Sequence, residues 1–236
     1  HCIERIETST GAAAIFVLGN GENAIIVSPG ANAMLTPENI RTRLSDIKRG
    51  DFLLCQLETP IETVAEAMSL ARKAGATTIL DPAPAMKLPA DLLSCADILT
   101  PNETEIHTIL GIEHTSDSSR AGSESHAQKI RVQGPVSVIL KLGDAGCLYG
   151  DGTETHFIDG HSVHAIDTTG AGDTFNGALA VKLAEGSSIS DALGFANAAA
   201  AISVTRPGAQ TSIPDRSAVE SFIETNEMPV ESKNSA

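Results

Sequence analysis

The chain has 236 residues, of which 42% are hydrophobic, so it is long enough to bury one sizeable core in a single domain. It carries 30 acidic against 16 basic residues, and the formal net charge of −14 excludes long-range attraction to nucleic acid or to an anionic membrane surface. We therefore expect small-molecule partners, with any anionic ligand held locally by helix N-termini, a metal ion or a few placed cations.

The four cysteines are scattered without Cys-x-x-Cys spacing, which favours the reducing cytoplasm. No apolar run approaches the length of a membrane span. The seven histidines form no metal-binding pattern. The pair His161 and His164 is incidental, since it falls where a strand and a loop are expected. The composition thus predicts a cytoplasmic protein with no membrane partner.

Two apolar runs, Ala12 to Leu18 and Ala24 to Val27, open the chain and flank the turn-forming segment Gly19 to Asn23. This pattern predicts an antiparallel hairpin. Since no helix follows, the Gly-x-Gly in the turn does not indicate a dinucleotide-binding loop.

From Thr36 onward the pattern becomes an alternation of helices and short buried strands. The expected strands are Asp51 to Leu57, Thr77 to Asp81, Ala96 to Thr100, Val136 to Leu142, Cys147 to Tyr149, Glu154 to Ile158 and Val163 to Ile166. The expected helices are Thr36 to Ile47, Pro60 to Ala74, Asn102 to Leu110, Ser123 to Val132, Ala171 to Ala184, Ile189 to Val204 and Asp215 to Thr225. Residues 31–227 are therefore predicted to form an α/β core, a mostly parallel sheet with helices on both faces, and residues 228–236 a polar C-terminal tail.

The most informative segment runs from Asp167 to Ala180 (DTTGAGDTFNGALA). Gly170 and Gly172 allow a tight turn before a helix, so backbone amides at Gly170, Ala171 and Gly172 can converge on an anion. Asp173 follows, where the helix dipole favours an ionised carboxylate. The segment lacks the Lys-Ser/Thr end of a P-loop and the third glycine of a dinucleotide fingerprint. An ordinary strand-to-helix junction is the alternative, but a base beside an anion hole favours phosphoryl transfer to a hydroxyl.

Several candidate site residues come soon after predicted strands. Glu58, Asn102, Gly143 and Gly170 each come after a strand, and the carboxyl ends of parallel strands meet at one edge of a sheet. The sequence therefore predicts that these positions converge on one site.

These motifs identify a family resemblance. The glycine segment resembles the C-terminal signature of the ribokinase-like (PfkB) family of sugar kinases, and further segments resemble ribokinases nearly word for word. They are Thr10 to Leu35, Gln56 to Thr63, Asp81 to Ala85, Thr100 to Glu105 and Ala198 to Ser212. The resemblance implies ATP-dependent phosphorylation of D-ribose to D-ribose 5-phosphate. A kinase for fructose or 2-keto-3-deoxygluconate, and a truncated non-catalytic nucleotide-binding remnant, are the alternatives.

The matching region begins after the first third of such enzymes, and the family's Gly-Gly-Lys-Gly-Ala-Asn sugar loop does not occur in this chain. We therefore expect the sequence to be a fragment that lacks an N-terminal portion. The resemblance also implies that residues 1–30 are part of a small β lid and that the lid mediates a homodimer.

Site residues follow from the same resemblance. It makes Asp173 the general base, the turn at Gly170, Ala171 and Gly172 the anion hole, and Glu58 together with Asp173 the sugar contacts. ATP contacts are implied for Asn102, Glu105, Lys141, Leu142, Gly143, Asp144, Ala145, Gly146, Gly172 and Asn197. Glu105 would hold Mg²⁺ through water, although an Asn followed by Glu three residues later is also an ordinary helix-capping pair.

A monovalent cation completes the implied site. Two segments would enclose K⁺ next to the anion hole, largely through backbone oxygens. Their residues are Asp167, Thr169, Ser203, Arg206, Gly208 and Ser212.

Overall fold

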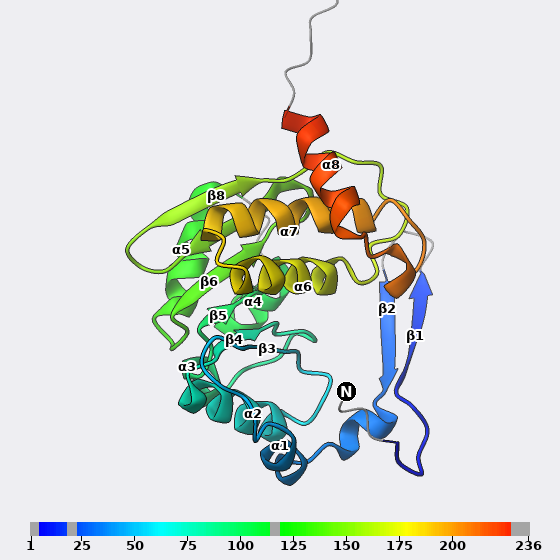
Figure 1. Cartoon of the computed structure of the whole chain (residues 1–236), viewed down its shortest axis with the longest axis vertical. Coiled ribbons are helices and arrows are strands. Elements are labelled where there is room, and N and C mark those ends of the chain that lie inside the picture. The colour runs from blue at the N-terminus through cyan, green and yellow to red at the C-terminus, as the bar shows by residue number, and fades with distance from the viewer. Residues whose placement is uncertain (1–4, 18–22, 114–118, 228–236) are drawn as a thin grey trace, which may run out of the picture.

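A computed structural model describes residues 5–17, 23–113 and 119–227 (Figure 1). The strands are β1 Ala12–Val17, β2 Asn23–Ser28, β3 Phe52–Cys55, β4 Thr77–Leu80, β5 Ile98–Leu99, β6 Ser137–Lys141, β7 Gly146–Gly150 and β8 Thr155–Asp159. The α-helices are α1 Pro37–Arg43, α2 Ile61–Ala74, α3 Ala90–Ser94, α4 Glu103–Leu110, α5 Arg120–Arg131, α6 Ala171–Ala184, α7 Ile189–Ser203 and α8 Arg216–Glu227. Short 3-10 helices are η1 Gly30–Met34, η2 Gly143–Ala145 and η3 Gln210–Ser212.

The main sheet has six strands in the order β3-β4-β5-β6-β7-β8. The first four are parallel, whereas β7 and β8 pair antiparallel at one edge. Helices connect the parallel strands because a chain must cross over the sheet to return in the same direction. This confirms the predicted α/β class with a mostly parallel sheet.

Side-chain alternation assigns each strand residue to one of two cores. Leu80 on β4 and Leu140 on β6 pack in the core cluster that includes residues of α2, α3, α4 and α5. Their neighbours Ile79 and Ile139 pack in the cluster that includes residues of α6 and α7. Because the period is two, Asp81 and Lys141 fall on the α6 side at the carboxyl ends of β4 and β6. Figure 1 shows α6 and α7 together on one face of the sheet, with α8 against α7.

The hairpin of β1 and β2 forms a separate two-stranded sheet beside the main body (Figure 1). Its antiparallel pairing confirms the predicted hairpin, although residues 18–22 of the predicted turn lie outside the described residues, as does the predicted tail at 228–236. Ile26 and Val27 are 65% and 54% exposed. The described part of the hairpin therefore presents apolar side chains to solvent.

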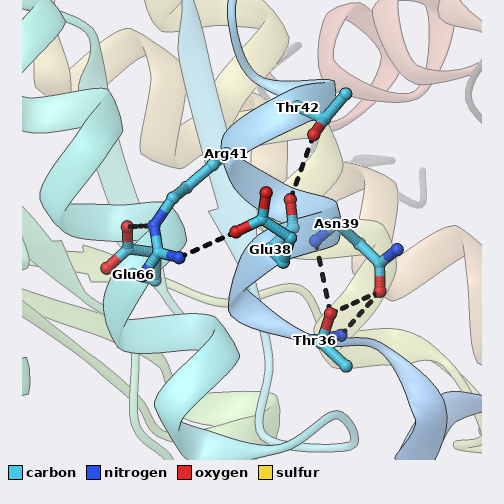
Figure 2. Close-up of polar contacts among 6 residues, drawn as sticks. All are labelled: Thr36, Glu38, Asn39, Arg41, Thr42 and Glu66. Atoms are coloured by element: carbon cyan, nitrogen blue, oxygen red, sulfur yellow. Dashed lines mark hydrogen bonds and ion pairs between the residues drawn. The ribbon is translucent and has the colours of Figure 1, made fainter.

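Helix α1 links the hairpin to the main body and begins with a capping box. Thr36 Oγ1 accepts the Asn39 amide at 3.3 Å, and Asn39 Oδ1 accepts the Thr36 amide at 3.0 Å (Figure 2). Arg41 then joins Glu38 of its own helix at 3.1 Å to Glu66 of α2 at 2.7 Å. Exposed pairs of this kind add little net stability, and of the two only the Arg41–Glu66 pair connects α1 to α2.

One predicted strand is absent from the described residues, and one helix was not predicted. Val163 to Ile166 is not a strand: the amides of Ile166 and Asp167 both donate to the carbonyl oxygen of Val204, at 2.7 and 3.2 Å. The segment thus runs along the end of α7 and pairs with no described strand. Helix α3 was not predicted, because a five-residue helix after Pro89 is too short to show helical periodicity.

Candidate active site

A cavity of about 520 Å³ opens at the carboxyl end of the parallel strands. Its size is within the roughly 300–1,000 Å³ usual for small-molecule sites, and its position is where ligands bind to open α/β sheets. Eight of the predicted ligand residues line it: Asn102, Lys141, Gly143, Asp144, Gly146, Ala171, Gly172 and Asn197. Small and apolar residues of α7 and of the segment before α6 complete the wall: Val163, Ala165, Ala200, Ala201 and Val204.

The glycine turn forms the N-terminal end of α6. Gly170 is the N-cap and has a φ of 77°, a left-handed conformation that favours glycine. Its carbonyl oxygen accepts the first helical amide, from Thr174, at 2.9 Å. The Ala171 amide donates to Thr168 at 3.2 Å, so an anion at this turn would share that donor. The other first-turn amides lack intrahelical acceptors, as at every helix start, and the helix dipole favours a negative ligand there.

Asp173 lies in the first turn of α6 and its side chain is exposed. Its Oδ1 accepts a hydrogen bond of 2.9 Å from Gln56 Nε2, which follows β3. Asp173 also lines a second cavity of about 310 Å³ between α6, α7 and α8. The carboxylate therefore reaches solvent and has one fixed oxygen, as a proton acceptor for a bound alcohol requires. Gln56 was not predicted as a site residue.

A buried ion pair lies beside the turn. Lys141 Nζ donates to Asp81 Oδ1 at 2.9 Å, with the two side chains 14% and 5% exposed. The other carboxylate oxygen of Asp81 accepts Asn176 Nδ2 of α6 at 2.6 Å. Burial raises the pKa of Asp81 above its usual value, and the Lys141 ammonium offsets part of that rise. Sequence reasoning missed Asp81 and Asn176, although Asp81 follows a buried strand just as Glu58 and Asn102 do.

Asn102 and Glu105 form a reciprocal capping box at the start of α4. The Glu105 amide donates to Asn102 Oδ1 at 2.8 Å, and the Asn102 amide donates to Glu105 Oε2 at 2.7 Å. The structure thus contains the helix-capping pair that the sequence analysis gave as the alternative to a ligand role. Burial raises the pKa of Glu105, and the positive charge of Lys141 opposes that rise. Asn102 also pairs with Lys141 across the sheet, which places the capping box beside the cavity.

The loop from Lys141 to Gly146 crosses from β6 to β7 through η2. The Leu142 amide donates to Gly146 at 2.9 Å, and left-handed φ values at Gly143 (60°) and Gly146 (100°) permit the turn. On the facing helix, Asn197 donates through Nδ2 to the carbonyl oxygens of Ile158 and Asp159, each at 3.3 Å. Asn197 therefore ties α7 to β8 at the cavity wall.

The two segments of the predicted K⁺ site lie side by side. Asp167 joins them, because its Oδ1 accepts the Thr169 amide at 3.0 Å and its Oδ2 accepts the Gly208 amide at 2.9 Å. Hydrogen bonding with the Thr169 side chain, and then with the Gly208 and Thr169 amides, lowers the pKa of Asp167 to about 2. Ser203 and Ser212 are buried, and their hydroxyls donate to backbone oxygens. Arg206 is exposed. The segments are thus brought together next to the glycine turn.

Glu58 is exposed and lies outside the 520 Å³ cavity. The backbone amide of its neighbour Leu57 donates to Ala83 at 2.8 Å, so the segment is nonetheless held at the same edge of the sheet.

The charges around the glycine turn are mainly negative. Asp81, Glu105 and Asp173 provide three carboxylates, whereas Lys141 provides one ammonium, which pairs with Asp81 and acts through its charge on Glu105. No group of three or more His, Cys, Asp or Glu able to hold a metal ion occurs in the part of the chain that the structure describes. Mg²⁺ would need only one or two of these carboxylates, because it is usually bound by that number together with phosphate oxygens and water.

Comparison with known proteins gives a family match over residues 1–216, to the pfkB family of carbohydrate kinases. The chain belongs to this family. It is 42% identical to the ribokinase of Haemophilus influenzae, over 91% of this chain and 69% of that protein. The ribokinase structure of Thermotoga maritima superposes with a TM-score of 0.80 at 41% identity, over 94% of this chain and 72% of the other. A structure of Arabidopsis thaliana ribokinase complexed with ribose and ATP gives the same TM-score at 31% identity, over 92% and 70% of the two chains.

The resemblance predicted from the motifs is therefore confirmed, and the protein is a sugar kinase.

No described helix of this sugar kinase is long and apolar enough to cross a membrane. Within the same residues, Cys55, Cys95 and Cys147 are free thiols.

Proposed function

We propose that this sugar kinase transfers the γ-phosphoryl group of ATP to the 5-hydroxyl of D-ribose and forms D-ribose 5-phosphate. The observation that carries the proposal is the position of an exposed carboxylate next to the cavity wall: Gly172 lines the 520 Å³ cavity, and the following residue, Asp173, lines the 310 Å³ cavity. The similarity to ribokinases, one of them solved with ribose and ATP, supports ribose as the acceptor.

In this proposal the cavity takes ATP. Asn102, Lys141 and the loop Leu142, Gly143, Asp144, Ala145 and Gly146 would bind the nucleotide, with Asn197 and the alanines of α7 beside the base. The backbone amides of the glycine turn would stabilise the transferring phosphoryl group, an effect worth about 2.7–4 kcal/mol per donor in well-studied anion holes.

Asp173 would accept the proton of the attacking hydroxyl. Phosphoryl transfer depends mainly on positioning and charge stabilisation, so a carboxylate positioned by Gln56 suffices as the base. Glu58 would bind the remaining sugar hydroxyls.

Two cations complete the proposal. Glu105 would hold Mg²⁺ through water; when bound, that ion neutralises phosphate charge in a site that already holds three carboxylates. Asp167, Thr169, Ser203, Arg206, Gly208 and Ser212 would enclose K⁺, and their fit is supported by the way Asp167 joins the two segments.

We further propose a cytoplasmic homodimer that pairs through the hairpin of residues 1–30, acting as a lid. A two-stranded sheet is marginal on its own in water, and the exposed Ile26 and Val27 would be covered by a second copy.

The test is ADP formation with ATP and Mg²⁺ and one sugar at a time: D-ribose, D-fructose or 2-keto-3-deoxygluconate. We expect D-ribose to give the highest kcat/KM. A preference for either other sugar would change the assignment of the acceptor, and nucleotide binding without turnover of any sugar would favour a non-catalytic remnant.

A further inference from the structure

The ion pair of Lys141 and Asp81 lies directly over the glycine turn. A Cβ built onto Gly172 would lie 3.3 Å from Lys141 Nζ and 3.8 Å from Asp81 Oδ2. The three contributing residues come from different elements: Asp81 follows β4, Lys141 ends β6 and Asn176 lies one turn into α6. The network therefore connects two strand ends to the helix that carries the turn.

Lys141 retains donors for a ligand. An ammonium has three N–H donors, and only the bond to Asp81 is seen among the described residues. Lys141 also lines the 520 Å³ cavity, whereas Asp81 does not. The Lys141 side of the ion pair thus lines the cavity, whereas the Asp81 carboxylate lies outside the cavity lining.

Lysine by itself is a poor phosphate clamp. Its four-carbon stem is flexible and loses rotamer freedom on binding, and the ammonium has no planar fork to fix its direction. A buried carboxylate removes that freedom before the ligand arrives, in the way that preorganisation raises affinity.

We infer that Asp81 is a positioning residue: held by Asn176, it fixes the Lys141 ammonium over Gly172 so that the ammonium meets the terminal phosphates of the nucleotide. This inference rests on the proposed function only in taking a nucleoside triphosphate as the ligand. A buried ion pair is costly in desolvation and adds little net stability, so a role in ligand binding explains its presence better than a role in folding.

Asn176 supports Asp81. It donates to Asp81 at 2.6 Å, and its own Oδ1 is buried with no hydrogen-bond partner among the described residues. The bond to Asp81 therefore orients the amide, which makes Asn176 a second place at which to perturb the carboxylate without removing either charge.

The experiment measures the affinities for ATP and adenosine by calorimetry, together with the melting temperature, for wild type, D81N, K141M and D81N/K141M. We expect D81N and K141M each to weaken ATP binding about tenfold, the value of one charge-assisted hydrogen bond, while adenosine affinity stays within about twofold. Since both variants remove the same contact, the double variant should lose no more than about tenfold.

D97N is the matched control. Asp97 is a partly buried carboxylate at the other end of the sheet, where its Oδ2 accepts the Thr78 amide at 2.9 Å. We expect D97N to bind ATP as wild type does.

Three results would overturn the inference: wild-type ATP affinity in folded D81N, equal weakening of ATP and adenosine, or additive losses in the double variant. If D81N does not fold, N176A replaces it, and wild-type ATP affinity in N176A would overturn the inference. Wild type that binds neither ATP nor inorganic tripolyphosphate would overturn it as well. ATP binding without sugar-dependent turnover would contradict the proposed function alone.

Discussion

Gln56 and Asp173 lie 117 residues apart in the sequence and are joined by a 2.9 Å hydrogen bond between Gln56 Nε2 and Asp173 Oδ1. The bond connects the end of β3 to the first turn of α6. It leaves Asp173 Oδ2 as the oxygen that can face an acceptor hydroxyl. The orientation of the proposed base therefore depends on a side chain that does not line the 520 Å³ cavity.

Removing the Gln56 amide should therefore reduce turnover more than binding. We expect Q56L to lower kcat by about tenfold, because small misplacements of a reacting group are costly, and to leave the Kd for ATP within about twofold. Steady-state kinetics and calorimetry measure the two quantities. An equal loss of kcat and ATP affinity would indicate general damage to the site instead.

Gly172 offers a test of the anion turn. Its φ is not left-handed, and alanine is the better helix former, so G172A should preserve or raise the melting temperature. The added Cβ, 3.3 Å from Lys141 Nζ, would occupy space over the turn. We expect ATP affinity to fall about tenfold, as for the loss of one charge-assisted hydrogen bond.

Gly177 on the same helix is the matched control, because a Cβ there meets nothing within 4 Å. G177A should change helix propensity alone and leave ATP affinity unchanged. If both variants bound ATP like wild type, the turn would not be the phosphate site.

The β7–β8 turn should confer acid-dependent stability. Asp151 accepts the amides of Thr153 and Glu154 at 2.8 and 3.0 Å, and these bonds lower its pKa to about 2. A lowered pKa in the folded state stabilises the fold above the unfolded-state value of about 3.9, and that contribution is lost as pH falls towards 2.

We expect the difference in melting temperature between wild type and D151A to be largest at pH 5–7 and to shrink between about pH 4 and pH 2. D151N keeps one acceptor oxygen without a charge, so its difference from D151A should vary less with pH. A wild-type-to-D151A difference that is constant across this range would show that the carboxylate charge does not matter.

The monovalent-cation proposal predicts a salt-specific effect. Replacing K⁺ by Na⁺ at constant ionic strength should lower kcat, because the segments joined by Asp167 would order the glycine turn less well around the smaller ion. The D167N variant should lose this dependence. Equal kcat values in both salts would contradict the proposed K⁺ site.

The sequence predicted the elements whose local signals are strong. The Val/Ile/Leu-rich run in Val136 to Leu142 and the helical pattern in Pro60 to Ala74 correspond to β6 and α2 within two residues at each end. Val163 to Ile166 resembled a strand because it is a short apolar run, but Val163 and Ala165 line the cavity, and local periodicity cannot distinguish this from a place in a sheet.

The missed site residues depend on distant partners. Asp81 meets Lys141 and Asn176 at sequence separations of 60 and 95, and no local pattern specifies such contacts. The strand-end criterion applied to Glu58 and Asn102 would have selected Asp81, had it been applied to Thr77 to Asp81. For Gln56 the sequence held no signal beyond its place after β3.

The most direct test of the central claim is ribose-dependent ADP formation by D173N compared with wild type, with the ATP affinity of both measured in parallel. We predict that D173N loses turnover by about 10²–10⁴-fold, the usual contribution of a general base, while its Kd for ATP stays within about twofold of wild type. Near-normal turnover by D173N would contradict the assignment of Asp173 as the base.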